Sequence, residues 1–174
     1  MNNSSRKVRG RVLALHPATT GFGWALFEGP LTPVDWGTAK VSKDRNAGCL
    51  ARIEVLIANL HPSEIVLESF EGNNVRRSAR IRRLYRSLIS LAGVNGIESR
   101  VFSREAIAKA FSSLGSPSRY EIAAAIASHV SAFEHLLPPR RKIWLPEDPR
   151  MALFNAAAVA MTYFAALEDT NFEF

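Results

Sequence analysis

The spacing of the apolar residues changes near residue 49, from every second residue to every third or fourth. In the earlier part, Phe22, Trp24 and Leu26 alternate with smaller residues, which is typical of a strand with one face in a core. Tight turns such as Gly29-Pro30 separate the apolar runs. The sequence therefore predicts an antiparallel meander of three short strands, over 11–15, 21–28 and 34–41.

Beyond that point the pattern predicts an amphipathic helix over 49–60, in which Leu50, Ile53 and Ile57 share one face. The short apolar run 65–67 is typical of a buried parallel strand, and it ends at Glu68. One more strand is expected over 97–102, and helices over 75–92, 103–114, 120–133 and 149–167. Three antiparallel strands followed by parallel βα units predict the α/β class, with one mixed sheet flanked by helices.

The length of 174 residues suits one domain, expected over 11–167, with a flexible basic N-terminal tail over 1–10 and a C-terminal tail over 168–174. The single cysteine excludes an intramolecular disulfide and favours a cytoplasmic location. The apolar segment 151–167 contains Asn155 and is expected to be a buried helix, so no membrane contact is predicted. A net charge of +6 favours a polyanionic partner, with nucleic acid first.

The positive charge is concentrated in one predicted helix, which has no acid between Asn73 and Gly96. Charged helix faces usually mix signs, so an uncompensated arginine face favours phosphate binding. Arg77 lies near the apolar edge of this helix, on the side that could approach Glu68. A second basic stretch adds Trp144, which is either a core or hinge residue or a platform for an exposed base. The nucleic-acid-binding residues expected are Arg76, Arg77, Arg80, Arg82, Arg83 and Arg86, with Arg140, Arg141 and Lys142.

Three ordered stretches resemble the RuvC family of Holliday junction resolvases. They are Leu13–Pro17 followed by Gly21–Ala25, Ile65–Phe70 with Asn73-Asn74, and the alanine-rich run Phe154–Met161. The resemblance spans about residues 11–167 and implies a ribonuclease H-like fold. It also implies the family's activity, which is cleavage of branched DNA by a homodimer that uses paired divalent metals.

The resemblance assigns the four catalytic acid positions of the family to His16, Glu68, Ala152 and Asn155, of which only Glu68 is an acid. Neutral histidine cannot bridge two magnesium ions as an aspartate does, because it offers one lone pair and no negative charge. His16, Glu68 and Asn155 therefore remain the candidate catalytic and metal residues for, at most, one ion such as manganese or magnesium. Glu71 is a possible substitute acid. The alternative is structural, with His16 hydrogen-bonded at a strand end and Asn155 a satisfied buried polar group.

The leading hypothesis is a RuvC-like protein that binds branched or structured DNA with weak or absent nuclease activity. The alternative is an active, metal-dependent junction endonuclease with a rearranged site. Two further classes of function stay open. The segment 16–21 faintly resembles the phosphate-binding hairpin of actin-like phosphotransferases. The arginine-rich helix could instead dock an acidic protein.

Overall fold

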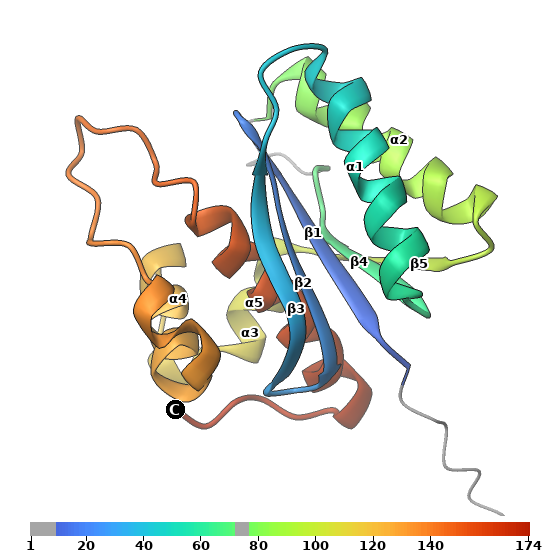
Figure 1. Cartoon of the computed structure of the whole chain (residues 1–174). Helices are drawn as coiled ribbons and strands as arrows, with labels where there is room; N and C mark the ends of the chain where they lie inside the picture. The colour runs from blue at the N-terminus through green and yellow to red at the C-terminus, as the bar shows by residue number, and fades with distance from the viewer. Residues whose placement is uncertain (1–9, 72–76) are drawn as a thin grey trace, which may run out of the picture.

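The computed structural model describes residues 10–71 and 77–174, and its centre is one five-stranded sheet (Figure 1). The strand order is β3-β2-β1-β4-β5. The first three strands pair antiparallel, whereas β4 pairs parallel with β1 and β5. The predicted mixed sheet of the α/β class is therefore confirmed. The strands are β1 (Val12–Ala18), β2 (Gly21–Gly29), β3 (Thr32–Lys40), β4 (Glu64–Glu68) and β5 (Glu98–Phe102).

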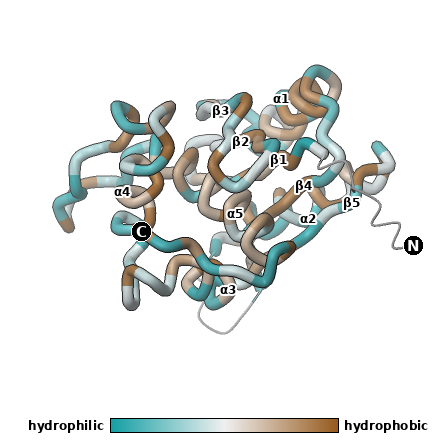
Figure 2. Tube along the Cα trace, turned by 90° about the horizontal axis from the view of Figure 1, so that it is seen from below, coloured by the Kyte–Doolittle hydropathy of each residue, from teal (hydrophilic) through white to brown (hydrophobic). Residues whose placement is uncertain are grey.

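Helices cover both faces of the sheet, and the two faces have separate apolar cores. One core packs the sheet against α1 and α2, and the other packs it against α3, α4 and α5. Figure 2 shows the strands crossing the molecule in the order given, with hydrophobic segments along the sheet and α5. The helices are α1 (Arg45–Leu60), α2 (Ala79–Val94), α3 (Arg104–Ala110), α4 (Arg119–His129) and α5 (Met151–Glu168), with 3-10 turns at Ser112–Leu114 and Ser131–Leu136.

The alternation of side chains along β1 decides which residues face α5. Leu13 and Leu15 belong to the core under α1 and α2, whereas Val12 and Ala14 belong to the core under α5. Because successive side chains on a strand point to opposite faces, His16 follows Ala14 onto the α5 side. The same alternation on β4 carries Glu68 onto that side.

The last helix, α5, is buried along most of its length, and every side chain from Met151 to Ala165 lies in the interior. By length and composition it could cross a membrane, but 83% of its apolar window is covered by the rest of the fold. The helix lies directly on β2, where Gly23 faces the backbone of Ala152. The prediction of a buried helix is confirmed.

Several element boundaries differ from those expected. Strand β1 continues through His16 and Pro17 to Ala18, because β2 pairs with it over its whole length. Helix α1 begins four residues early, at Arg45, and α2 begins at Ala79, where the Ser78 side chain accepts the Ile81 N–H. Helices α3 and α4 end at residues 110 and 129 and continue as 3-10 turns.

The segment 169–174 has no regular structure, yet it packs against the body of the fold. Phe174 stacks on Phe111 at 5.5 Å between ring centroids, and Phe172 lies at the same distance. The Phe172 backbone N–H donates to the Ala110 carbonyl at 3.0 Å. These contacts cover the ends of α3 and α4.

Candidate functional site

The structure brings the three candidate site residues together where β1 and β4 end. The parallel register pairs Leu15 with Leu67, so His16 and Glu68 are the next residues along adjacent strands. His16 Nδ1 lies 3.9 Å from Glu68 Oε2. Asn155, on α5, places its Nδ2 3.4 Å from His16 Nε2. All three side chains are buried, and they lie at the edge of the sheet where open α/β folds bind ligands.

The carboxylate of Glu68 is bound by Arg119, the first residue of α4. The two guanidinium nitrogens Nη1 and Nη2 donate to Oε2 and Oε1 at 2.9 and 2.7 Å, a bidentate pair that engages both oxygens. The Glu68 side chain is only 4% exposed. Charge-assisted bidentate pairs of this geometry are among the stronger polar contacts in proteins. Sequence reasoning did not assign Arg119 to the site.

Two further arginines surround the same carboxylate. Arg77 Nη2 lies 4.0 Å from Glu68 Oε2, which confirms the predicted approach of this residue to Glu68. Burial lowers the pKa of Arg104, and the positive charge of Arg119 lowers it further, while Glu68 acts in the opposite direction. Glu68 thus lies among arginine side chains, and Glu105 and Glu147 also act electrostatically on Arg104 and Arg119.

His16 is held in its neutral form. Burial lowers its pKa well below 6.5, and the charges of Arg77 and Arg119 act in the same direction. An amide N–H of Asn155 donating to Nε2 leaves the imidazole proton on Nδ1, which faces Glu68. The neutral ring therefore orients toward the carboxylate without adding a positive charge.

Lowering the pH should therefore destabilise the folded protein through His16. In the unfolded chain this imidazole takes up a proton near pH ~6.5, whereas the folded site resists protonation. Because the unfolded state then binds more protons, stability is lost as the pH falls below about 6.5, by at most ~1.4 kcal/mol per pH unit. Urea unfolding at pH 5–7 would measure this slope. The slope of stability against pH should be shallower in His16→Asn.

The residues at this site do not fit the paired divalent metals that the RuvC resemblance implies. Magnesium needs hard oxygen ligands in octahedral geometry, and both Glu68 oxygens are already bound by Arg119. The other positions hold a neutral imidazole, an amide and Ala152. Within residues 10–71 and 77–174, no three His, Cys, Asp or Glu side chains come close enough to hold a metal ion. Glu71 is exposed and lies in the loop after β4.

The arginines of α2 divide into two groups. Arg82, Arg83 and Arg86 are exposed, as expected for a phosphate-binding face, and Arg86 also lies over the Phe70 ring at 5.9 Å. Arg80 differs from the expectation, because it turns inward. Its guanidinium donates to the carbonyls of Ala18 and Thr19 and to Asn46 Oδ1, so it joins α2 to α1 and to the β1–β2 turn. Arg76 lies outside the described residues.

The second basic stretch lies on the other side of the site, in the connector 137–150 between the last 3-10 turn and α5. A cleft of about 340 Å³ joins the two regions, since Arg119 lines it together with Arg140 and Arg141. Glu147 and Asp148 line it too, and Asp148 is engaged by Arg150 at 2.8 Å. Arg140, Arg141 and Lys142 are exposed. Basic side chains thus flank the Glu68 site on both sides, from α2 and from the connector.

The position of Arg119 follows from a local sequence signal. Ser118 and Glu121 form a capping box, in which Ser118 Oγ accepts the Glu121 N–H and the Glu121 carboxylate accepts the Ser118 N–H at 2.6 Å. The pattern Ser-x-x-Glu marks a helix start and therefore fixes α4 to begin at Arg119. The tertiary fold, and not this local signal, places the first turn of α4 against the end of β4.

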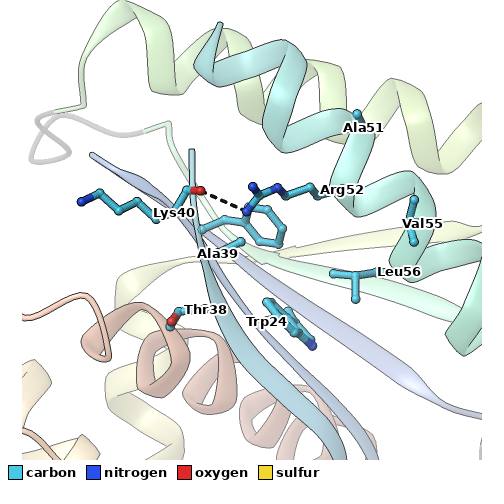
Figure 3. A pocket seen from close by; sticks show the side chains of 9 residues that line it. Trp24, Thr38, Ala39, Lys40, Ala51, Arg52, Val55 and Leu56 are labelled. Carbon is cyan, nitrogen blue, oxygen red and sulfur yellow. Dashed lines mark hydrogen bonds between the residues drawn. The ribbon is translucent and has the colours of Figure 1, made fainter. Parts of the chain in front are cut away.

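A second hollow, of about 630 Å³, lies between α1 and the strands β2 and β3 (Figure 3). Trp24, Val55 and Leu56 give it an apolar lining. Arg52 crosses one side of it and donates to the Lys40 carbonyl at 3.0 Å. The residues that line it include no acid, histidine or cysteine.

Comparison with known proteins gives matches among solved structures. No protein-family model and no curated protein matches the sequence. The structure of Thermus thermophilus RuvC matches with a TM-score of 0.66 at 17% identity, over 92% of this chain and 97% of that one. T. thermophilus RuvC in complex with a Holliday junction substrate matches with a TM-score of 0.68 at 16% identity, also over 92% of this chain and 97% of that one. The yeast mitochondrial Holliday junction resolvase Ydc2 matches with a TM-score of 0.62 at 13% identity, over 96% of this chain and 84% of that one.

Similarity at these identities concerns the arrangement of the backbone. It extends over 92–96% of this chain and over 84–97% of the chains it matches. The resemblance inferred from three short sequence stretches is thereby confirmed at the level of the fold. This chain has a RuvC-like, ribonuclease H-like α/β fold.

Proposed function

We propose that this chain binds branched or structured DNA, and that its nuclease activity is weak or absent. The observation that carries the proposal is the bidentate pair between Glu68 and Arg119. Glu68 is the one acid among the four catalytic acid positions that the resemblance assigns, and Arg119 binds both of its oxygens. A two-metal nuclease needs anionic ligands that hold two cations about 4 Å apart. Here an internal cation already neutralises the carboxylate, and Arg77 lies beside it.

The charge of the site supports binding without a metal ion. Phosphate oxygens are attracted to guanidinium groups, which contact them in a bidentate geometry. Exposed arginines on α2 and in the connector extend this positive region beyond the site. One of the similar structures holds a Holliday junction substrate, which makes a four-way junction the first DNA to test.

The experiment incubates the purified protein with a labelled four-way junction, a matched duplex and single strands, in magnesium, manganese or chelator. Each mixture is run on one native and one denaturing gel. We expect junction-selective shifts that are equal in magnesium and in chelator, and no metal-dependent nicks. A triple variant in which glutamine replaces Arg82, Arg83 and Arg86 should bind DNA at least tenfold more weakly. Loss of phosphate contacts weakens binding to any DNA.

The alternative function, a nuclease with a rearranged site, has one observation in its favour. His16, Glu68 and Asn155 do lie together, and the donor atoms of a single-ion site could come from them. Nicks that need manganese or magnesium and disappear in Glu68→Gln would establish this alternative and contradict the proposal. Glu54→Gln is the matched control, because it removes an exposed acid from α1, which packs on the other face of the sheet. Absence of any shift at moderate salt would refute both functions.

A further inference from the structure

The connector between the last 3-10 turn and α5 presents three exposed apolar side chains in a row. Ile143 is 89% exposed and Trp144 is 76% exposed, and Leu145 follows them. The connector stands out from the body of the fold in both views (Figures 1 and 2). A large aromatic side chain in this position loses hydrophobic stabilisation unless something covers it. Exposed apolar clusters of this kind mark interaction sites.

Contacts within the connector hold the tip in a defined turn. The Leu145 N–H donates to the Lys142 carbonyl at 3.0 Å, which places Ile143 and Trp144 at the apex. Arg141 Nη1 donates to the Leu145 carbonyl at 3.3 Å across the same turn. Lys142 Nζ lies 5.7 Å from the centre of the Trp144 ring. The aromatic ring is thus presented by a closed turn with two basic groups beside it.

The base of the connector is joined to the helix that carries Arg119. The Tyr120 hydroxyl donates to the Pro138 carbonyl at 3.0 Å, and the Arg140 guanidinium lies over the Tyr120 ring at 5.4 Å. Tyr120 directly follows Arg119, which binds Glu68. The cleft that Arg119 shares with Arg140 and Arg141 lies between the two. The position of the tip is therefore tied to the Glu68 site through α4.

The chemistry of the tip favours a nucleic-acid base over an apolar protein or lipid surface. Three basic residues and no acid lie in 138–146, so a polyanion is the complementary partner. An exposed indole offers a flat face on which any base stacks, and the neighbouring cations contact the phosphates on either side. Paired bases inside a duplex are already stacked, so a free base face is found at branches, bulges and single strands.

We infer that Trp144 stacks on an exposed base face where DNA branches or bulges, with Arg140, Arg141 and Lys142 on the adjoining phosphates. This rests on the proposed function, and it names the feature of the DNA that the connector recognises. It also gives the protein a way to distinguish a branched DNA from a duplex. The contact requires no metal ion and no movement of the Glu68 site.

The experiment measures binding of the full chain to a four-way junction, a duplex with a two-nucleotide bulge and the matched duplex. Trp144→Ala should weaken binding to the first two by about tenfold, within the range that loss of one base–aromatic stack produces. Binding to the matched duplex should stay within twofold. Trp144→Phe keeps a flat ring and should bind within threefold of the wild type. Ile143→Ala, the matched control at the preceding position, should leave binding to all three DNAs unchanged, because an aliphatic side chain does not stack on a base.

Fluorescence gives a second readout in the same titrations. Of the three tryptophans, Trp24 donates to Asp35 and Trp36 packs against Phe133, so Trp144 is the one that DNA should quench. Quenching by the bulged duplex that disappears in Trp144→Phe is the expected result. If Trp144→Ala binds every DNA as the wild type does and no quenching occurs, the inference is wrong while the proposed function stands. If the wild type binds no DNA and its emission shifts only with anionic phospholipid vesicles, the tip is a membrane contact, and both proposals fail.

Discussion

Substituting Arg119 with alanine is expected to lower the free energy of unfolding by about 3 kcal/mol at neutral pH. The substitution leaves the Glu68 carboxylate buried without its bidentate partner, and removing one member of a buried ion pair is strongly destabilising. Arg77 Nη2 remains 4.0 Å from the Glu68 carboxylate and still compensates part of its charge. The loss of stability therefore lies at the lower end of the range that is usual for breaking a buried ion pair. Urea unfolding followed by circular dichroism measures it.

Two variants show whether the loss comes from the uncompensated charge. Arg11→Ala removes an arginine from an exposed pair with Glu28, and it should cost less than about 1 kcal/mol. The double variant Glu68→Gln with Arg119→Ala removes both charges and should recover a large part of the stability lost in Arg119→Ala. Equal destabilisation of Arg119→Ala and the double variant would contradict this account, since the loss would then come from packing alone.

Substituting Gly23 with alanine should destabilise the protein by about as much, roughly 3 kcal/mol, for a steric reason. A Cβ on Gly23 would collide with the carbonyl group of Ala152 and lie 2.5 Å from the Leu153 nitrogen. Both are backbone atoms of the buried helix α5, so no side chain can rotate to make room. The helix would have to move away from β2, which would also move Asn155 away from His16. Thermal and urea unfolding measure the change.

Gly93→Ala is the matched control and has the opposite expected sign. Gly93 lies inside α2, and a Cβ there would meet nothing within 4 Å. Alanine favours the helix over glycine, so the free energy of unfolding should rise by roughly 0.5–1 kcal/mol. If Gly23→Ala is as stable as the wild type, α5 does not approach β2 as closely as described here, and the close contact would be refuted.

The strands and their order could be predicted because they follow from local spacing, whereas the convergence of the site residues is implied by the resemblance to the RuvC family. The apolar run of β1 and the short run ending at Glu68 predict two strands, and in the structure these pair in parallel and carry His16 and Glu68 to one edge. The alanine-rich pattern of α5 adds Asn155 to the same place. The resemblance, and not the element order alone, therefore predicts that three distant segments meet.

The ion pair at the centre of the site could not be predicted, because its members lie 51 residues apart. No local pattern indicates that α4 begins beside the end of β4. The inward orientation of Arg80 could not be predicted either, since helical periodicity does not show that α1 and the β1–β2 turn offer acceptors to its guanidinium group. The roles of the basic residues, the homodimer and the cytoplasmic location stay predictions.

The pair between Arg119 and Glu68 also has a kinetic consequence for the proposed function. A nuclease ends each encounter by breaking its substrate, whereas a protein that does not cut leaves DNA only by dissociating. Its effect on a branch is then set by residence time, and changes at an interface usually act on the dissociation rate more than on association. For this protein, the half-life of the complex on a junction would replace turnover as the quantity that describes its activity.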